Sequence, residues 1–430
     1  MTSPAPNKPW NWPPTGWASS KPWPSATCSK TLRCAAEPAL GIEHYDLIIV
    51  GGGIHGAGVA QCAAARGHST LVLEQRELAF GTSSRSSKLI HGGLRYLESG
   101  QFSLVRECLR ERALLLQLAP ELVRLVPFHI PVYRRTSRRP WQLRLGLSLY
   151  ALLGGLERDT RFHRVPRRRW DELDGLLTQG LEAVYQYYDA QTDDAALTRA
   201  VMRSAESLGA EFKAPASFQR AELNANGAVV SYRHRNNEHQ CQGRVLVNAA
   251  GPWVKQVLDA VSPAPRALDV ELVQGTHIIL NRAPHQGIYY VEAPSDRRAV
   301  FVMPWQNRTL VGTTEHIYEG DPSAVQPLPQ ERDYLKETLV HYFPRYRDSA
   351  IEKAFAGLRV LPKGPGSPFG RSRDTLLLTD REQRPRLLSI YGGKLTAYRA
   401  TAEQVMDRLM ASLPPRQAVA DTRRLMLHPA

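Results

Sequence analysis

The sequence predicts an α/β chain in which a parallel βαβ domain is interleaved with a second domain built on an antiparallel sheet (α+β). Three observations lead to this prediction. A short apolar run, Tyr45 to Val50, is followed by closely spaced glycines and an alanine-rich helix. Between about Asp269 and Glu315 the pattern changes to short strands joined by turn residues. A chain of 430 residues with 43% hydrophobic content is long enough for two such domains.

The first strand leads into glycines with the G-x-G-x-x-G spacing, at Gly51, Gly53 and Gly56. They allow a tight turn, a close approach of the backbone to a pyrophosphate, and close packing of the following helix, whose N-terminus attracts an anion. A second strand, Thr70 to Leu73, then ends at Glu74, about 20 residues after the glycines, where a ribose-binding carboxylate belongs. This context predicts a Rossmann-type dinucleotide-binding unit.

The remaining elements follow from apolar spacing and from turn or capping residues. A Ser/Gly-rich segment, Gly81 to Ser87, precedes a helix with a buried stripe, and a second helix starts at Asp193 and Asp194. The other expected elements are strands at Val245 to Val247, Val270 to Ile279, Tyr289 to Glu292, Ala299 to Trp305, Thr309 to Val311 and Leu387 to Tyr391, a helix at Arg332 to Tyr342, and a final helix ending near Leu413.

Two discontinuous domains fit this order. We expect the nucleotide-binding domain to comprise residues 43–105, 190–260 and 352–413, and the substrate or cap domain to comprise residues 106–189 and 261–351. Residues 1–42 carry tryptophans among prolines without apolar periodicity, so we expect a disordered tail, with a docking motif as the alternative. Residues 414–430 follow two prolines and are expected to be a frayed terminus.

The formal charge of +14 implies attraction to anions: nucleic acid, an acidic membrane, a phosphorylated substrate or the phosphates of a cofactor. Arginines are dense from Arg134 to Arg169, around an apolar segment, Leu145 to Leu156, that follows Trp141. This pattern is typical of an interfacial helix on an anionic bilayer, although a buried helix with solvated ends fits equally well. Nucleic acid ranks lower because no recognition motif accompanies the arginines.

Other sequence features narrow the class of protein. The apolar segment is shorter than the roughly 18 residues that a membrane-spanning helix needs. The five cysteines are odd in number and form no C-x-x-C pair, which argues against a disulfide framework or a zinc site. We therefore expect a cytoplasmic protein without a metal, which contacts the inner face of the cytoplasmic membrane if the interfacial reading holds.

Several motifs together resemble the FAD-dependent glycerol-3-phosphate dehydrogenases of the aerobic type, over roughly Tyr45 to Leu409. The Ser86 to Glu98 block, Ser-Ser-Lys-Leu-Ile-His-Gly-Gly-Leu-Arg-Tyr-Leu-Glu, is the most specific of them. The others are the glycine motif from Gly51, Asn248 to Trp253, Gly275 to His277, Gly312 to Thr314, and Gly392 to Arg399. The chain differs from the family in having His55 for the usual Asn, Leu358-Arg359-Val360-Leu361 for Val-Arg-Pro-Leu, and no helical C-terminal domain.

The resemblance implies noncovalently bound FAD. Gly51, Gly53, Gly56 and Glu74 would hold its ADP half, and Ser86, Ser87, Lys88, Gly251, Gly392, Gly393, Lys394, Leu395 and Thr396 would surround the rest. It also implies that the phosphate of the substrate is clamped by Arg95, Tyr96, Arg359 and Arg373. The chemistry agrees, because guanidinium groups bind phosphate oxygens in pairs.

The implied reaction moves a hydride from carbon to flavin N5, while a base takes the hydroxyl proton. An imidazole suits the role of the base, so His277 is the first candidate for it. His91 and Lys394 are the alternatives for the base or for a polarising cation, and Arg359 is counted as a further catalytic residue. Either histidine could instead be a hydrogen-bonded structural residue.

The expected function is oxidation of sn-glycerol 3-phosphate to dihydroxyacetone phosphate, with electrons passed to a membrane quinone or another acceptor. One alternative is an oxidase or dehydrogenase of another phosphorylated or carboxylated alcohol or of an amine. An alternative of another class is a non-catalytic flavin-binding protein that docks on membranes. The sequence is compatible with a homodimer.

Overall fold

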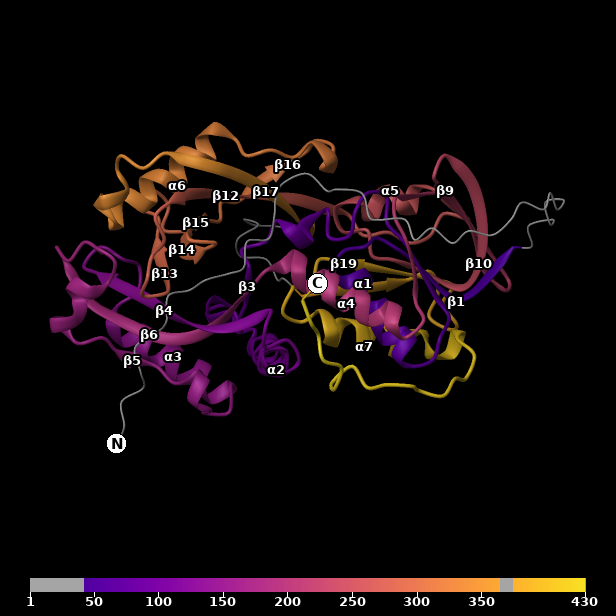
Figure 1. Ribbon diagram of the computed structural model, residues 1–430, viewed down its shortest axis with the longest axis horizontal. Coiled ribbons are helices and arrows are strands. Elements are labelled where there is room, and N and C mark those ends of the chain that lie inside the picture. Colours follow the sequence, from indigo (N-terminus) through magenta and orange to yellow (C-terminus); the bar gives the residue numbers. More distant parts are fainter. Residues whose placement is uncertain (1–41, 364–373, 430) are drawn as a thin grey trace, which may run out of the picture.

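Two β-sheets lie side by side in the computed structural model, which describes residues 42–363 and 374–429 (Figure 1). Within these ranges one sheet has nine strands and the other has ten. The nine-stranded sheet is largely parallel around its centre, whereas the ten-stranded sheet is mostly antiparallel. The predicted fold class, a Rossmann-type α/β domain interleaved with an antiparallel-sheet domain, is therefore confirmed.

The nine-stranded sheet is organised around β1 (Glu43–Val50), which pairs in parallel with β2 (Thr70–Leu73) and with β10 (Asn237–Asn248). From Tyr45 onward every residue of β1 is buried, including Asp46, and this explains the apolar run Leu47 to Val50. The other strands of this sheet are β7 (Glu211–Lys213), β8 (Ala216–Asn224), β9 (Gly227–His234), β11 (Val261–Ser262), β18 (Leu376–Thr379) and β19 (Leu387–Tyr391).

Three helices cover one face of this sheet: α1 (Ile54–Ala65), α4 (Asp194–Ser207) and α7 (Tyr398–Leu409) (Figure 1). Alanines and glycines along α1 allow both neighbours to approach closely; a Cβ at Gly58 would lie 2.8 Å from the ring of Tyr398. The short helix α5 (Val254–Asp259) packs into the apolar cluster on the other face. As predicted, Asp193 caps α4, accepting a hydrogen bond from the Ala196 amide at 3.0 Å.

The ten-stranded sheet contains β12 (Val270–Asn281), which pairs antiparallel with three other strands. These are β15 (Arg308–Gly312), β16 (His316–Tyr318) and β17 (Ile351–Pro362). The other strands of this sheet are β3 (Leu89–Ile90), β4 (Val123–Tyr133), β5 (His163–Arg164), β6 (Leu181–Thr192), β13 (Ile288–Glu292) and β14 (Ala299–Trp305). Helices α2 (Phe102–Leu118), α3 (Pro140–Leu153) and α6 (Pro329–Tyr342) occur between strands of this sheet in the sequence. The predicted strands and helix between residues 270 and 342 are confirmed.

Two predicted domain assignments are wrong. Strand β17 was assigned to the nucleotide-binding domain from residue 352 on, yet it pairs with β12 along almost its whole length. Strand β3, inside the range 43–105, pairs with β6 of the ten-stranded sheet. Both strands run beside the boundary between the sheets, and composition cannot reveal which partner a strand selects.

The predicted frayed terminus is also wrong. Arg416 forms an ion pair with Asp46 at 3.1 Å, and the amides of Val419 and Ala420 donate to the carbonyl of Ala65. Leu427 is 2% exposed within the apolar cluster around α1. The segment is thus held by backbone hydrogen bonds and by two buried side chains, Thr422 and Leu427. The predicted disordered tail falls almost entirely on residues 1–41, outside the described residues.

Candidate active site

A cavity of about 450 Å³ brings together residues from both sheets. Its lining includes sixteen of the predicted site residues: Gly51, Gly53, Glu74, Ser86, Ser87, His91, Arg95, Tyr96, Gly251, His277, Arg359, Gly392, Gly393, Lys394, Leu395 and Thr396. Gly56 and Lys88 do not line it, and Arg373 lies outside the described residues. Segments far apart in the sequence therefore converge on one site.

The turn between β1 and α1 can only be made by glycine. Gly51 has φ +113°, and a Cβ there would lie 2.6 Å from the carbonyl oxygen of Ala249. A Cβ at Gly56 would lie 1.9 Å from the carbonyl oxygen of Gly51, so Gly56 serves the packing of α1 against the turn. The backbone of Gly51 and Gly53 is left open to the cavity at the N-terminus of α1, a geometry that accepts a pyrophosphate.

Glu74 lies at the end of β2 with its carboxylate beside that turn. Oε2 accepts a hydrogen bond from the Gly52 amide at 2.7 Å, and Oε1 accepts one from the Arg76 amide at 2.9 Å. Burial raises the pKa of Glu74, while these amides oppose the change. A carboxylate fixed in this way can still accept a hydrogen bond from a ribose hydroxyl through its remaining lone pairs.

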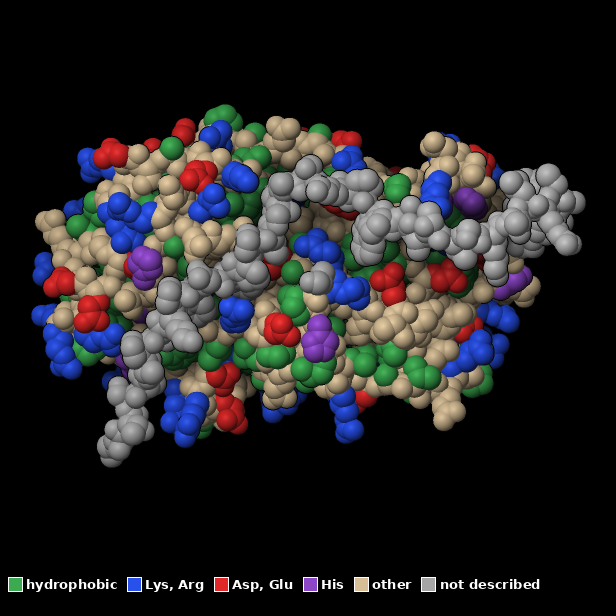
Figure 2. All heavy atoms as spheres, in the orientation of Figure 1, with side chains coloured by type: hydrophobic (Ala, Val, Ile, Leu, Met, Phe, Trp, Pro, Cys, Tyr) green, Lys and Arg blue, Asp and Glu red, His purple; other side chains and the backbone are tan. Residues whose placement is uncertain are grey.

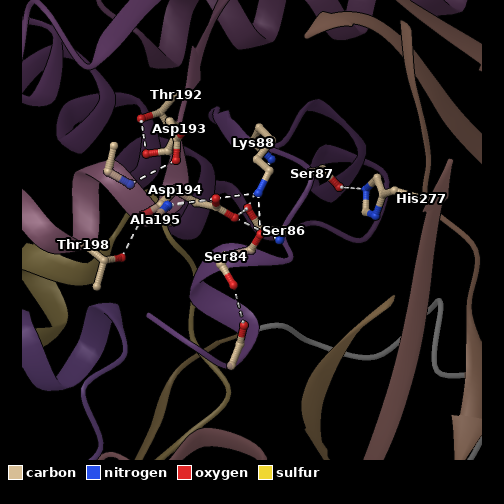
Figure 3. Close-up of polar contacts among 12 residues, drawn as sticks. Ser84, Ser86, Ser87, Lys88, Thr192, Asp193, Asp194, Ala195, Thr198 and His277 are labelled. Atoms are coloured by element: carbon tan, nitrogen blue, oxygen red, sulfur yellow. Dashed lines mark hydrogen bonds and ion pairs between the residues drawn. The ribbon is translucent and has the colours of Figure 1, made fainter. Parts of the chain in front are cut away.

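The ammonium group of Lys88, a predicted cofactor-binding residue, is held by protein partners beside the cavity (Figure 3). Its Nζ donates to Asp194 Oδ1 and to the Ser84 carbonyl, both at 2.5 Å, and its side chain is buried. Asp194 Oδ2 also accepts from the amide and hydroxyl of Ser86, at 2.9 and 2.6 Å. One buried carboxylate at the start of α4 thus fixes the segment that carries Ser86 and Ser87 into the cavity.

His277 is held by Ser87 and by an aromatic ring. Its Nε2 lies 2.9 Å from Ser87 Oγ (Figure 3), and its imidazole stacks on Phe355 with the ring centres 4.9 Å apart. Burial, together with the positive charges of Lys88 and Arg359, lowers the pKa of His277 to about 3. The imidazole is therefore neutral at physiological pH, and its buried Nδ1 has no hydrogen-bond partner among the described residues.

At one end of the cavity, cationic side chains surround Tyr96. The Lys394 ammonium lies 3.7 Å from the ring centre of Tyr96, and the Arg95 guanidinium lies 5.4 Å from it. Arg359, from β17, donates to Glu315 Oε1 at 2.7 Å and to the Thr314 carbonyl at 3.2 Å. Burial and the neighbouring Arg95 lower the pKa of Arg359, and Glu315 opposes this. The arrangement concentrates positive charge where an anion can enter.

Sequence reasoning missed several residues of this lining. Arg298 donates to the Glu315 carbonyl at 3.0 Å and pairs with Asp296 at 3.2 Å. Arg85, next to the predicted serines, also lines the cavity, as does the acid Glu315 itself. Arg85 and Glu315 adjoin the motifs Ser86 to Glu98 and Gly312 to Thr314, so widening each motif by one residue would have found them.

Comparison with known proteins identifies the class. The family model described as FAD dependent oxidoreductase matches residues 46–399, and the chain belongs to that family. FAD is accordingly its cofactor, and the glycine turn, where a Cβ at Gly51 or Gly56 would collide with the backbone, suits the pyrophosphate of this dinucleotide. In this family the flavin supplies the oxidising centre.

Individual relatives show which members of this family the chain is similar to. The chain is 37% identical to the aerobic glycerol-3-phosphate dehydrogenase of Escherichia coli (strain K12), with 86% of this chain and 74% of the relative covered. It is 36% identical to the D-erythritol 1-phosphate dehydrogenase of Brucella abortus (strain 2308), with 88% and 75% covered. The glycerol-3-phosphate dehydrogenase from Bacillus halodurans, solved with FAD, has 26% identity and a TM-score of 0.70, with 90% of this chain and 68% of that chain covered. The resemblance to glycerol-3-phosphate dehydrogenases is thereby confirmed.

Proposed function

We propose that the protein is an FAD-dependent dehydrogenase of a phosphorylated polyol, and that it oxidises sn-glycerol 3-phosphate to dihydroxyacetone phosphate. The observation that carries this proposal is the group of cations at one end of the FAD cavity: Arg95, Arg359 and Lys394 around Tyr96. The similarity to glycerol-3-phosphate dehydrogenases over 86% of the chain supports the substrate class.

In this proposal Arg359 and Arg95 bind the phosphate of the substrate. A guanidinium group offers two parallel donors to phosphate oxygens, so two such groups fix both position and orientation. Arg359 is oriented in advance by Glu315 and the Thr314 carbonyl, which reduces the ordering that binding requires. Tyr96 supports the cations through its ring, and Arg373 is proposed as a further contact from the family resemblance.

His277 is the proposed acceptor of the hydroxyl proton, with His91 and Lys394 as the alternatives that line the same cavity. If Nε2–H is donated to Ser87 Oγ, the lone pair of Nδ1 remains to accept a proton. Burial and, after it, the positive charge of Lys88 and Arg359 lower the pKa of His277 and keep it weakly basic before substrate binds. A bound phosphate offsets that charge, so substrate binding strengthens the base at the moment it is needed.

A second substrate of the same class is D-erythritol 1-phosphate, because the relative that acts on it is nearly as similar, at 36% identity. Both compounds present a phosphate and a secondary alcohol, and the clamp residues do not distinguish them. A dye-coupled assay with the purified holoenzyme should give a higher kcat/KM for glycerol 3-phosphate. A higher kcat/KM for erythritol 1-phosphate would replace the first substrate by the second, and turnover of neither would refute the proposed class.

We propose further that electrons pass to a membrane quinone and that helix α3 seats the protein on the bilayer. One face of α3 is buried, through Leu143 and Leu147, while Trp141, Leu145 and Leu152 are 60–66% exposed on the opposite face. Exposed arginines lie within the helix, at Arg144, and in the sequence on either side of it, at Arg134, Arg135, Arg139, Arg158, Arg161, Arg164, Arg167, Arg168 and Arg169. An apolar stripe bordered by cations fits an anionic lipid surface.

On the face shown in Figure 2, basic side chains lie over the whole surface, and several of them are at the left end, where Figure 1 places β4, β5 and β6. No helix in the described part of the chain is long and apolar enough to cross a membrane. Contact at the level of the lipid headgroups is therefore the mode we propose.

A further inference from the structure

His55 lies between two segments that line the FAD cavity. It is the second residue of α1, directly after the glycine turn, and it lines the cavity itself. Its ring packs against Gly393, where an added Cβ would lie 2.1 Å from His55 Nε2. Gly393 belongs to the segment Gly392 to Thr396 that precedes α7. The imidazole therefore fits only because position 393 has no side chain.

Neither ring nitrogen of His55 forms a hydrogen bond within the described residues, and Nδ1 is buried. Other histidines differ in this respect. One ring nitrogen of His129 bonds to Gln186 Oε1, and one of His277 bonds to Ser87 Oγ. Nδ1 is enclosed by protein atoms, so Nε2, on the side of Gly393, is the ring nitrogen that a ligand can reach from the cavity. Polar atoms in folded proteins are nearly always paired, so an unpaired imidazole in the lining of a ligand cavity indicates a partner in the ligand.

The protonation state of His55 defines what it can offer. Burial lowers the pKa of His55 to about 4, and no charged neighbour contributes to the change. At physiological pH the ring is neutral, with one N–H donor and one acceptor nitrogen. The segment of FAD between its adenosine and its flavin ring carries both kinds of partner: pyrophosphate oxygens that accept and ribityl hydroxyls that donate.

We propose that His55 is a cofactor-binding residue whose imidazole hydrogen-bonds oxygen atoms in the pyrophosphate and ribityl segment of FAD. The side chain reaches this segment from the N-terminus of α1, where the glycine turn receives the pyrophosphate. An asparagine at the same place would also carry one donor and one acceptor group. The inference depends on FAD alone and is independent of the substrate that the enzyme oxidises.

The test is a titration of apo-protein with FAD, in which the quenching of flavin fluorescence measures binding. His55→Leu removes both hydrogen-bonding atoms at similar size, and we expect it to raise the Kd for FAD about tenfold. His55→Asn should stay within about threefold of the wild type. His129→Asn is the matched control, because His129 is also buried with an unpaired Nδ1 but does not line the cavity. It should leave the Kd for FAD unchanged.

Wild-type affinity in His55→Leu would overturn the proposal, as would an equal loss in His129→Asn. If His55→Leu fails to fold, nitrogen NMR of the wild-type protein provides the second measurement. The ring nitrogens of His55 should shift when FAD is added to the apo-protein, and unchanged resonances at saturating FAD would contradict the contact. Titration with ADP, which has the pyrophosphate but no ribityl chain, shows which part of FAD His55 contacts. Weaker ADP binding by His55→Asn or His55→Leu places the contact at the pyrophosphate. Unchanged ADP binding places it at the ribityl chain.

Discussion

Arg359 donates a hydrogen bond to Glu315 at 2.7 Å, so an arginine of the proposed phosphate clamp is already oriented by a carboxylate inside the cavity. The neighbouring Thr314 is fixed in turn, because its hydroxyl donates to Glu331 Oε1 at 2.5 Å and accepts from the Thr276 amide at 2.9 Å. Glu331 lies in the first turn of α6 and is buried. The end of the cavity that binds the anion is thus supported by a connected polar network.

Arg359→Ala should lower kcat/KM for glycerol 3-phosphate, with a loss of transition-state stabilisation of roughly 2 to 5 kcal/mol. The reason is that the phosphate would lose two charge-assisted donors and Glu315 would lose its partner. Steady-state kinetics with a dye acceptor measures this. Arg308→Ala is the matched control, since Arg308 is a surface arginine that also pairs with a glutamate, Glu352. Kinetics unchanged by Arg359→Ala would remove Arg359 from the site.

Glu315→Ala should raise KM for glycerol 3-phosphate more than it lowers kcat, because Arg359 must then be ordered by the substrate itself. Glu315→Gln keeps an oxygen acceptor at the same place and should show a smaller rise in KM. A fall in KM in both variants would instead mean that Glu315 mainly repels the phosphate of the substrate, and the orienting role would be abandoned.

The stability of the apo-protein should fall as the pH is lowered, because His277 is buried in its neutral form. Its pKa is about 3 in the folded protein and near 6.5 when unfolded, so the unfolded state takes up the proton first as the pH falls. The stabilising contribution is complete above about pH 6.5 and decreases toward pH 3, by up to about 1.4 kcal/mol per pH unit. Urea unfolding at pH 7, 6 and 5 should show a weaker loss in His277→Gln. An identical loss in both proteins would contradict a neutral buried imidazole.

Membrane docking through α3 predicts that the protein pellets with anionic vesicles and that salt releases it, since the surface is rich in arginine. Leu145→Glu combined with Leu152→Glu should abolish pelleting by placing charge on the apolar stripe. Met410→Glu changes an equally exposed apolar residue elsewhere, at 62% exposure, and should pellet normally. Equal pelleting of all three proteins would exclude α3 as the contact.

The features predicted from sequence are those encoded locally. The glycine turn, Glu74 and the strands from Val270 to Val311 each follow from short-range spacing, and each forms where expected. The partners of two strands could not be predicted, because they are distant in sequence: Leu89 of β3 pairs with Gln191, and Pro362 of β17 pairs with Val270. The ion pair of Lys88 could not be predicted for a related reason: its partner Asp194 is 106 residues distant in sequence.

Anaerobic titration of the holoenzyme with sn-glycerol 3-phosphate tests the central proposal most directly. The absorbance band of oxidised flavin should bleach, and one dihydroxyacetone phosphate should form for each flavin reduced. D-erythritol 1-phosphate serves as the competing substrate in a parallel titration. Enzyme that retains bound FAD yet is bleached by neither compound would contradict a dehydrogenase of phosphorylated polyols.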